Sequence, residues 1–149
     1  MITQEIYIPK YDWLIHAYFA VDDYYTDDIM QHLWELGCDA EPARRAYENL
    51  SSGELNTGLC YSNYKLRETV MVIAKTSSAD EFLNSLLHEL THFQSHVQKA
   101  YELEKTGEDV AYLVGDVVML MYPKIQHLLC DCCRAKKHIG YGRERERER

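Results

Sequence analysis

The chain has 149 residues and a formal net charge of −8, with 46% hydrophobic and 27% charged residues. This length is typical of one domain that can bury a core without disulfides. The acidic balance argues against a nucleic-acid partner, which needs a basic face. No apolar run is long enough to cross a bilayer, and the N-terminus shows no signal peptide. We therefore expect a cytoplasmic protein with no membrane partner, and the sequence leaves its oligomeric state open.

The first part of the chain predicts a β-hairpin followed by two helices. Residues 2–8 and 13–21 are rich in aromatic and β-branched residues and are separated by a turn that contains a proline. Residues 26–36 carry apolar residues at helical spacing, with a glycine directly after them. A second helix is expected from about Pro42, in its first turn, to about Leu50.

Two more strands and a long helix follow. Residues 58–62 and 68–74 are predicted strands, and the second is continuously apolar, which is typical of a strand at the centre of a sheet. Ser78 and Glu81 have the spacing of a capping box, in which the two side chains bond the first backbone N–H groups of a helix. The helix that they open is expected to reach about Glu104.

The last elements are again helical. Thr106 is expected to cap a helix that runs to about Met121, and a last short helix is expected over residues 124–137. Together these elements predict an α+β fold, with a mixed sheet of about four strands packed on the long helix. Residues 1–140 are expected to form this single domain, and residues 141–149 to form a charged, low-complexity tail.

The most informative motif is His-Glu-x-x-His, at His88, Glu89 and His92. Residues four apart lie on one face of a helix, so both imidazoles can reach one metal ion. Zinc accepts imidazole nitrogen at about 2.0–2.1 Å. Glu89 lies one step round the helix, where it can act as a general base on a water molecule held by the metal. The motif predicts a Zn²⁺ site, and the alternative is two surface histidines on an amphipathic helix.

An apolar stripe on the same helix is expected to bury it against the sheet, which would place the site on a rigid element. It consists of Phe82, Leu83, Leu86, Leu87, Leu90, Phe93 and Val97.

A catalytic zinc site needs a third protein ligand. His96 is an unsuitable candidate, because eight residues of helix separate it from His88, and it is expected to be a surface or supporting residue. The break before the next helix lets the chain fold back, which favours Glu108 as the third ligand. Asp109 and Glu104 are its competitors, and stabilisation of a helix start is the alternative role of Glu108.

This pattern resembles the gluzincin branch of the zincin metallopeptidases. Residues 82–96 and 107–116 more narrowly resemble small proteins of phages and mobile elements that are described as metallopeptidases. The resemblance implies a zincin-like domain in which His88 and His92 hold zinc together with Glu108, and Glu89 is the base. It matches no residue to the transition-state stabiliser of the family. Tyr112 is a candidate for that role by helical spacing, and a core position is the alternative.

Three cysteines lie close together near the end of the chain. Cys130 and Cys133 share one helical face, and Cys132 lies between them. The spacing fits no zinc-finger pattern, so packed free thiols are expected rather than a second metal site.

The sequence thus favours a zinc-dependent peptidase that acts on a peptide or protein substrate. Backbone groups around residues 56–65 could bind an extended peptide by strand addition. The competing hypothesis is a binding or assembly module with a zincin fold and no turnover, because a chain of 149 residues leaves little material for a deep specificity cleft. A third hypothesis is an amphipathic helix that binds no metal.

Overall fold

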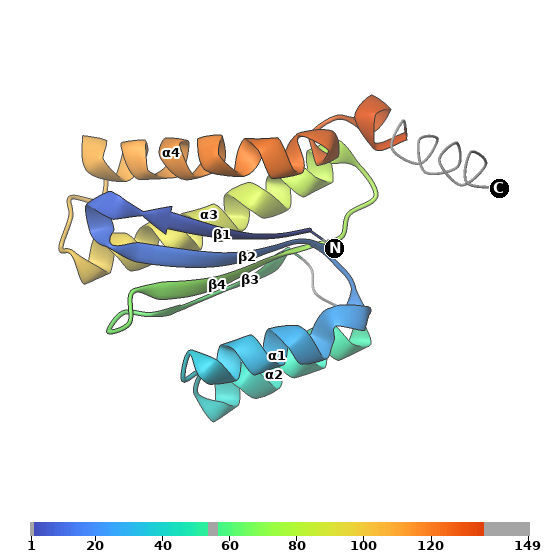
Figure 1. The fold of residues 1–149 in the computed structure, drawn as a ribbon, viewed down its shortest axis with the longest axis horizontal. Helices are drawn as coiled ribbons and strands as arrows, with labels where there is room; N and C mark the ends of the chain where they lie inside the picture. Colours follow the sequence, from blue (N-terminus) through green and yellow to red (C-terminus); the bar gives the residue numbers. More distant parts are fainter. Residues whose placement is uncertain (1, 54–56, 136–149) are drawn as a thin grey trace.

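The computed structural model describes residues 2–53 and 57–135 (Figure 1). The predicted tail at 141–149 lies outside the described residues. The strands are β1 (Ile2–Ile8), β2 (Trp13–Val21), β3 (Gly58–Asn63) and β4 (Glu68–Ala74). The α-helices are α1 (Thr26–Glu35), α2 (Ala40–Ser52), α3 (Ala79–Ala100) and α4 (Glu108–Ile125). Three short 3-10 helices are η1 (Pro9–Tyr11), η2 (Asp23–Tyr25) and η3 (Gln126–Leu128).

The four strands form one mixed sheet in the order β1-β2-β4-β3. β1 and β2 form the expected antiparallel hairpin, β2 and β4 are parallel, and β3 and β4 are antiparallel. Six of the seven residues of β4 are buried, and β4 lies inside the sheet as its apolar run predicted. β3 is left at one edge of the sheet.

The sheet lies between two helical layers, with α3 and α4 on one face and α1 and α2 on the other (Figure 1). Side chains alternate along β2, so Trp13, Ile15 and Phe19 join the larger core under α3 and α4. The alternation breaks at Ala20, which has a φ of 56°, and the pairing with β4 shifts there. Val21 therefore packs in the smaller core, under α1 and α2.

The start of α3 differs in detail from the predicted capping box. Ser78 has the extended backbone of an N-cap, but its hydroxyl donates to Asp80 Oδ1 at 2.5 Å instead of bonding the helix backbone. The Glu81 carboxylate accepts from the backbone N–H and the hydroxyl of Ser77. The reciprocal contact is thus displaced by one residue, because two serines compete for the acidic side chains of the first turn.

The predicted end of α3 near Glu104 is wrong, since the helix ends at Ala100. Glu102 takes a φ of 53°, and the N–H of Leu103 donates to the carbonyl of Gln98 at 2.9 Å. This is a Schellman termination, which normally uses glycine at the left-handed position. No glycine stands there, so the sequence carried no stop signal.

α4 also begins and ends later than predicted. Gly107 is its N-cap and Thr106 makes no cap, and the helix continues through Pro123 to Ile125. Met121 and Ile125 are fully buried, so core packing on both sides of the proline outweighs its missing backbone hydrogen bond. Among residues 2–53 and 57–135, no helix is long and apolar enough to cross a membrane.

Candidate metal centre

The two histidines of the motif meet on one exposed face of α3. The Nε2 atoms of His88 and His92 are 3.2 Å apart, and the ring centroids are 4.9 Å apart. Two nitrogens that bind one tetrahedral zinc ion at 2.0–2.1 Å lie about 3.3–3.4 Å from each other. The separation of the two nitrogens is close to that of two ligands on a single zinc ion, and it also suits a hydrogen bond between the two rings.

Glu89 points inward from the same turn and is only 2% exposed. Its Oε1 accepts a hydrogen bond of 2.8 Å from the hydroxyl of Thr57, the residue before β3. Burial raises the pKa of Glu89 above its ordinary value, while the Thr57 hydrogen bond and the nearby His88 and His92 oppose that rise. The carboxylate is thus held in a partly apolar place beside two imidazoles.

Gly58 makes room for this arrangement at the start of β3. A Cβ at this position would lie 1.8 Å from the carbonyl oxygen of Val72 and 3.1 Å from Cγ of Glu89. Only glycine therefore lets β3 approach β4 and α3 so closely. The sequence did not indicate these roles of Thr57 and Gly58, because both depend on contacts with Glu89, more than thirty positions away, and that of Gly58 also on Val72.

His96 is not a metal ligand in this arrangement but joins α3 to the sheet. Its Nδ1 lies 2.7 Å from the hydroxyl of Ser62, which lies 2.7 Å from that of Thr69. Thr69 in turn accepts from the indole N–H of Trp13 at 2.8 Å. Thr69 accepts from the indole, and the two hydroxyls and the imidazole then continue a network from β2 to α3 that suits a neutral imidazole. Burial lowers the pKa of His96, which favours the same neutral form.

The expected third ligand does not join the histidine pair. The described residues contain no group of three or more His, Cys, Asp or Glu side chains that could hold a metal ion. α4 does return antiparallel to α3 (Figure 1), but it begins beside Gln94, whose amide donates to the carbonyl of Val110 at 3.4 Å. Gln94 is two residues after His92 and so points to roughly the opposite side of α3. Glu108 as a ligand stays a prediction without geometric support.

The competitors of Glu108 have other neighbours. Asp109 forms an ion pair of 2.8 Å with Lys10 in η1. Glu104 lies against Gly107, at the turn before α4. Neither residue belongs to a group that could hold a metal among the described residues.

Two expectations about buried side chains are wrong. Tyr112 is 64% exposed, so it is not a core tyrosine, and its role as a transition-state stabiliser stays untested. Cys130, Cys132 and Cys133 are exposed as well, not packed. In the apolar stripe of α3, Leu83 and Leu87 are exposed and the other five side chains are buried.

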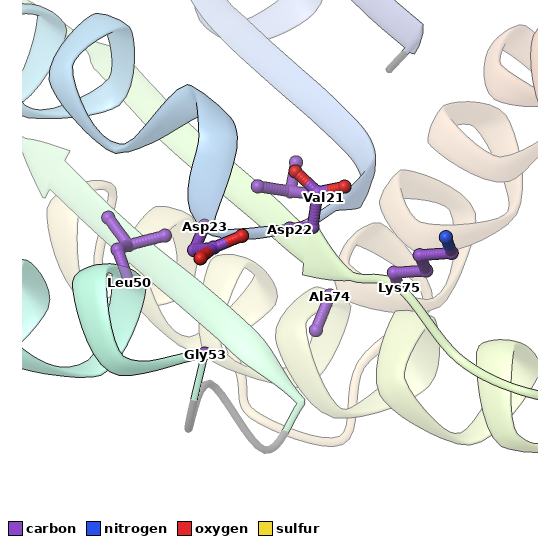
Figure 2. A pocket seen from close by; sticks show the side chains of 7 residues that line it. All are labelled: Val21, Asp22, Asp23, Leu50, Gly53, Ala74 and Lys75. Atoms are coloured by element: carbon purple, nitrogen blue, oxygen red, sulfur yellow. The ribbon is translucent and has the colours of Figure 1, made fainter.

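A pocket of about 240 Å³ opens at the carboxyl ends of the parallel strands β2 and β4 (Figure 2). Its lining consists of Val21, Asp22, Asp23, Leu50, Gly53, Ala74 and Lys75. Figure 2 shows Lys75 at the opposite side of the pocket from Leu50. The N–H of Ala74, which lines the pocket, donates to the carbonyl of Thr57 at 3.0 Å. The pocket therefore adjoins Thr57, the residue whose hydroxyl bonds Glu89.

Comparisons with protein-family models, with curated proteins and with solved structures find no match to this chain. A function for the chain therefore has to be argued from the geometry of its own residues.

Proposed function

We propose that this protein is a zinc-dependent metallopeptidase with a small zincin-like domain. The observation that carries the proposal is the pair of imidazole nitrogens on α3, 3.2 Å apart, which matches the spacing of two ligands on one zinc ion. The surrounding architecture supports it. A mixed sheet packs under the helix that carries the motif, and the edge strand β3 runs beside that helix.

The residues of the chain have separate roles in this proposal. His88 and His92 hold the ion, which supplies Lewis-acid polarisation of a carbonyl and lowers the pKa of water. Glu89 takes a proton as general base and returns it to the leaving amine. The hydrogen bond from the Thr57 hydroxyl fixes the orientation of the Glu89 carboxylate.

A peptide substrate suits the shape of the site. β3 is an edge strand, so its outer backbone groups can pair with an extended chain. Such a chain would run beside Glu89, because Thr57 and Gly58 join the start of β3 to that side chain. The substrate class is thus an extended segment of peptide or protein.

The first experiment measures zinc content of the purified protein by elemental analysis. We expect one zinc per chain in the wild type and a large loss of zinc in His92→Ala. The matched control is His96→Gln, on the same helix, which should keep its zinc because His96 faces Ser62 on β3. A His92→Ala protein that binds as much zinc as the wild type would refute the site.

The second experiment separates the base from the metal. Glu89→Gln keeps the shape of the side chain and can still accept from Thr57, so we expect a folded protein that retains zinc and loses cleavage of a peptide library. Full activity of Glu89→Gln would overturn the mechanism.

Glu108→Gln tests the third ligand that the sequence predicts. Because α4 begins on the far side of α3 from His92, we expect this change to leave zinc affinity almost unchanged. A loss of zinc comparable to that of His92→Ala would instead assign the third position to Glu108.

A second candidate function is a zincin-like binding module that holds zinc without turnover. One observation favours it: Glu89 is almost fully buried and bonded to Thr57. Stoichiometric zinc without cleavage across a broad peptide library, together with a stable partner in pull-down experiments, would decide for this module.

A further inference from the structure

The three clustered cysteines lie in a short turn that follows η3. Cys130, Cys132 and Cys133 are all exposed, in contrast to Cys60, which is half-buried between the sheet and α3. No part of the metal centre proposed above uses this turn. An inference about these cysteines is therefore independent of the proposed function.

The backbone of the turn brings two of the three thiols together. The N–H of Arg134 donates to the carbonyl of Cys130 at 3.0 Å, which closes one helical turn. Side chains three positions apart in such a turn are neighbours, with Cβ atoms about 5–6 Å apart. A disulfide needs Cβ atoms about 3.5–4.5 Å apart, so the two residues must approach by about 1–2 Å when the bond forms. Cys133 is three positions from Cys130 in this turn, so the two thiols lie on the same side of it. Cys132 is two positions from Cys130 and projects to a different side of the turn.

Two contacts fix this turn to the segment that opens α3. The carboxylate of Asp131 accepts from the backbone N–H of Ala79, the first residue of α3, at 2.8 Å. The guanidinium of Arg134 donates to the carbonyl of Thr76 at 2.6 Å. These contacts hold the backbone of the turn that carries Cys130 and Cys133 against the start of α3.

We propose that Cys130 and Cys133 form a redox-active dithiol that exchanges with low-molecular-weight disulfides. The Cys130 thiolate attacks one sulfur of the small disulfide, so a mixed disulfide forms and one small thiolate leaves. The Cys133 thiolate then attacks the sulfur of Cys130 and expels the second small thiol. Two protein thiols are oxidised to one disulfide, one small disulfide is reduced to two thiols, and the protons pass to the leaving thiolates.

The electrostatics of the turn agree with this order of attack. Hydrogen bonds from the backbone and thiol of Cys133, and from the backbone of Cys132, lower the pKa of the Cys130 thiol. A lower pKa means more thiolate at neutral pH, and the thiolate is the nucleophile. Burial raises the pKa of Cys60 and of Cys38, so these two thiols serve as unreactive internal references.

The test exposes the full-length protein to oxidised glutathione and follows its intact mass and its free thiols. We expect the wild type to lose two of its five thiols and two hydrogens of mass, with no bound glutathione at the end. Cys132→Ser is the matched control and should form the same disulfide. Cys133→Ser should stop at the first step and keep one glutathione on Cys130.

Other outcomes would overturn the proposal. One is loss of the intramolecular disulfide in Cys132→Ser, which would assign the bond to Cys132. Another is a wild type that keeps all five thiols under conditions that oxidise a reference dithiol. A third is oxidation that begins only after a chelator removes zinc from these thiols, because a metal-thiolate site would then explain the cluster.

Discussion

Thr57→Val removes the hydroxyl that holds Glu89 and leaves the shape of the side chain almost unchanged. Oε1 of Glu89 would lose the hydrogen bond of 2.8 Å, and the carboxylate is only 2% exposed, so water can replace the donor only if the start of β3 moves. The backbone contact from Ala74 to the Thr57 carbonyl does not depend on the side chain. The substitution therefore tests this one interaction.

Its magnitude follows from the charge and burial of Glu89. A hydrogen bond to an ionised group contributes about 1.5–3 kcal/mol to the free energy of unfolding. For a domain of this size, about 1 kcal/mol corresponds to about 2–4 °C in Tm, so Tm of Thr57→Val should fall by about 3–12 °C. In a Glu89→Gln background the bond is between neutral groups and contributes about 0.5–1.5 kcal/mol. In a double-mutant cycle, Thr57→Val and Glu89→Gln should therefore show a coupling free energy of about 1 kcal/mol.

The assay is chemical denaturation of the wild type, the two single variants and the double variant at one alkaline pH, chosen because burial raises the pKa of Glu89. Thr57→Ser, which keeps the hydroxyl, is the control and should retain most of the stability. Equal losses from Thr57→Val in both backgrounds would refute the reasoning, because the hydroxyl would then stabilise the fold without acting on the carboxylate.

The remaining predictions concern two glycines and a histidine. Gly58→Ala places a Cβ 1.8 Å from the Val72 carbonyl and should cost about 3 kcal/mol or more in thermal or chemical unfolding. Gly115→Ala lies inside α4 with open space around the new Cβ, so it should instead raise the free energy of unfolding by about 0.5–1 kcal/mol. If both glycine substitutions changed the free energy of unfolding in the same direction, the packing argument would be contradicted. Burial, and then the charge of His16, lower the pKa of His32. Its contribution to stability is therefore present above its unfolded pKa of about 6.5 and is lost as pH falls below that value and through the lower folded-state pKa. Denaturation measured across this range should show a smaller loss for His32→Asn, and an unchanged pH profile would contradict it.

The strands and helices were largely predictable because their signals are local. The apolar run of β4 and the helical spacing in α1 depend only on residues close together in the sequence. Gly37 follows α1 and takes the left-handed conformation that its position predicts. The errors fall where termination depends on tertiary packing. Glu102 accepts a left-handed backbone without being a glycine, and burial of Ile125 carries α4 past its proline.

Only the part of the candidate site that lies within one helix, α3, was predictable from the sequence. Residues four apart on α3 had to lie together, and the contact between His88 and His92 agrees with that expectation. The identity of a third ligand depends on which side of α3 the next helix takes, and helical periodicity does not encode that side. The support of Glu89 by Thr57 comes from strand pairing across the sheet, which no local pattern in the sequence reveals.

The parallel pairing of β2 with β4 has a consequence for how the chain folds. Residues 22–67 must form a closed loop before these strands can meet, whereas β3, β4 and α3 follow one another directly. Loop closure costs entropy before long-range contacts repay it, so contacts between nearby segments form more readily. The histidine pair, Glu89 and Thr57 all belong to that continuous stretch, and its strand hairpin and helix can assemble before the N-terminal hairpin docks.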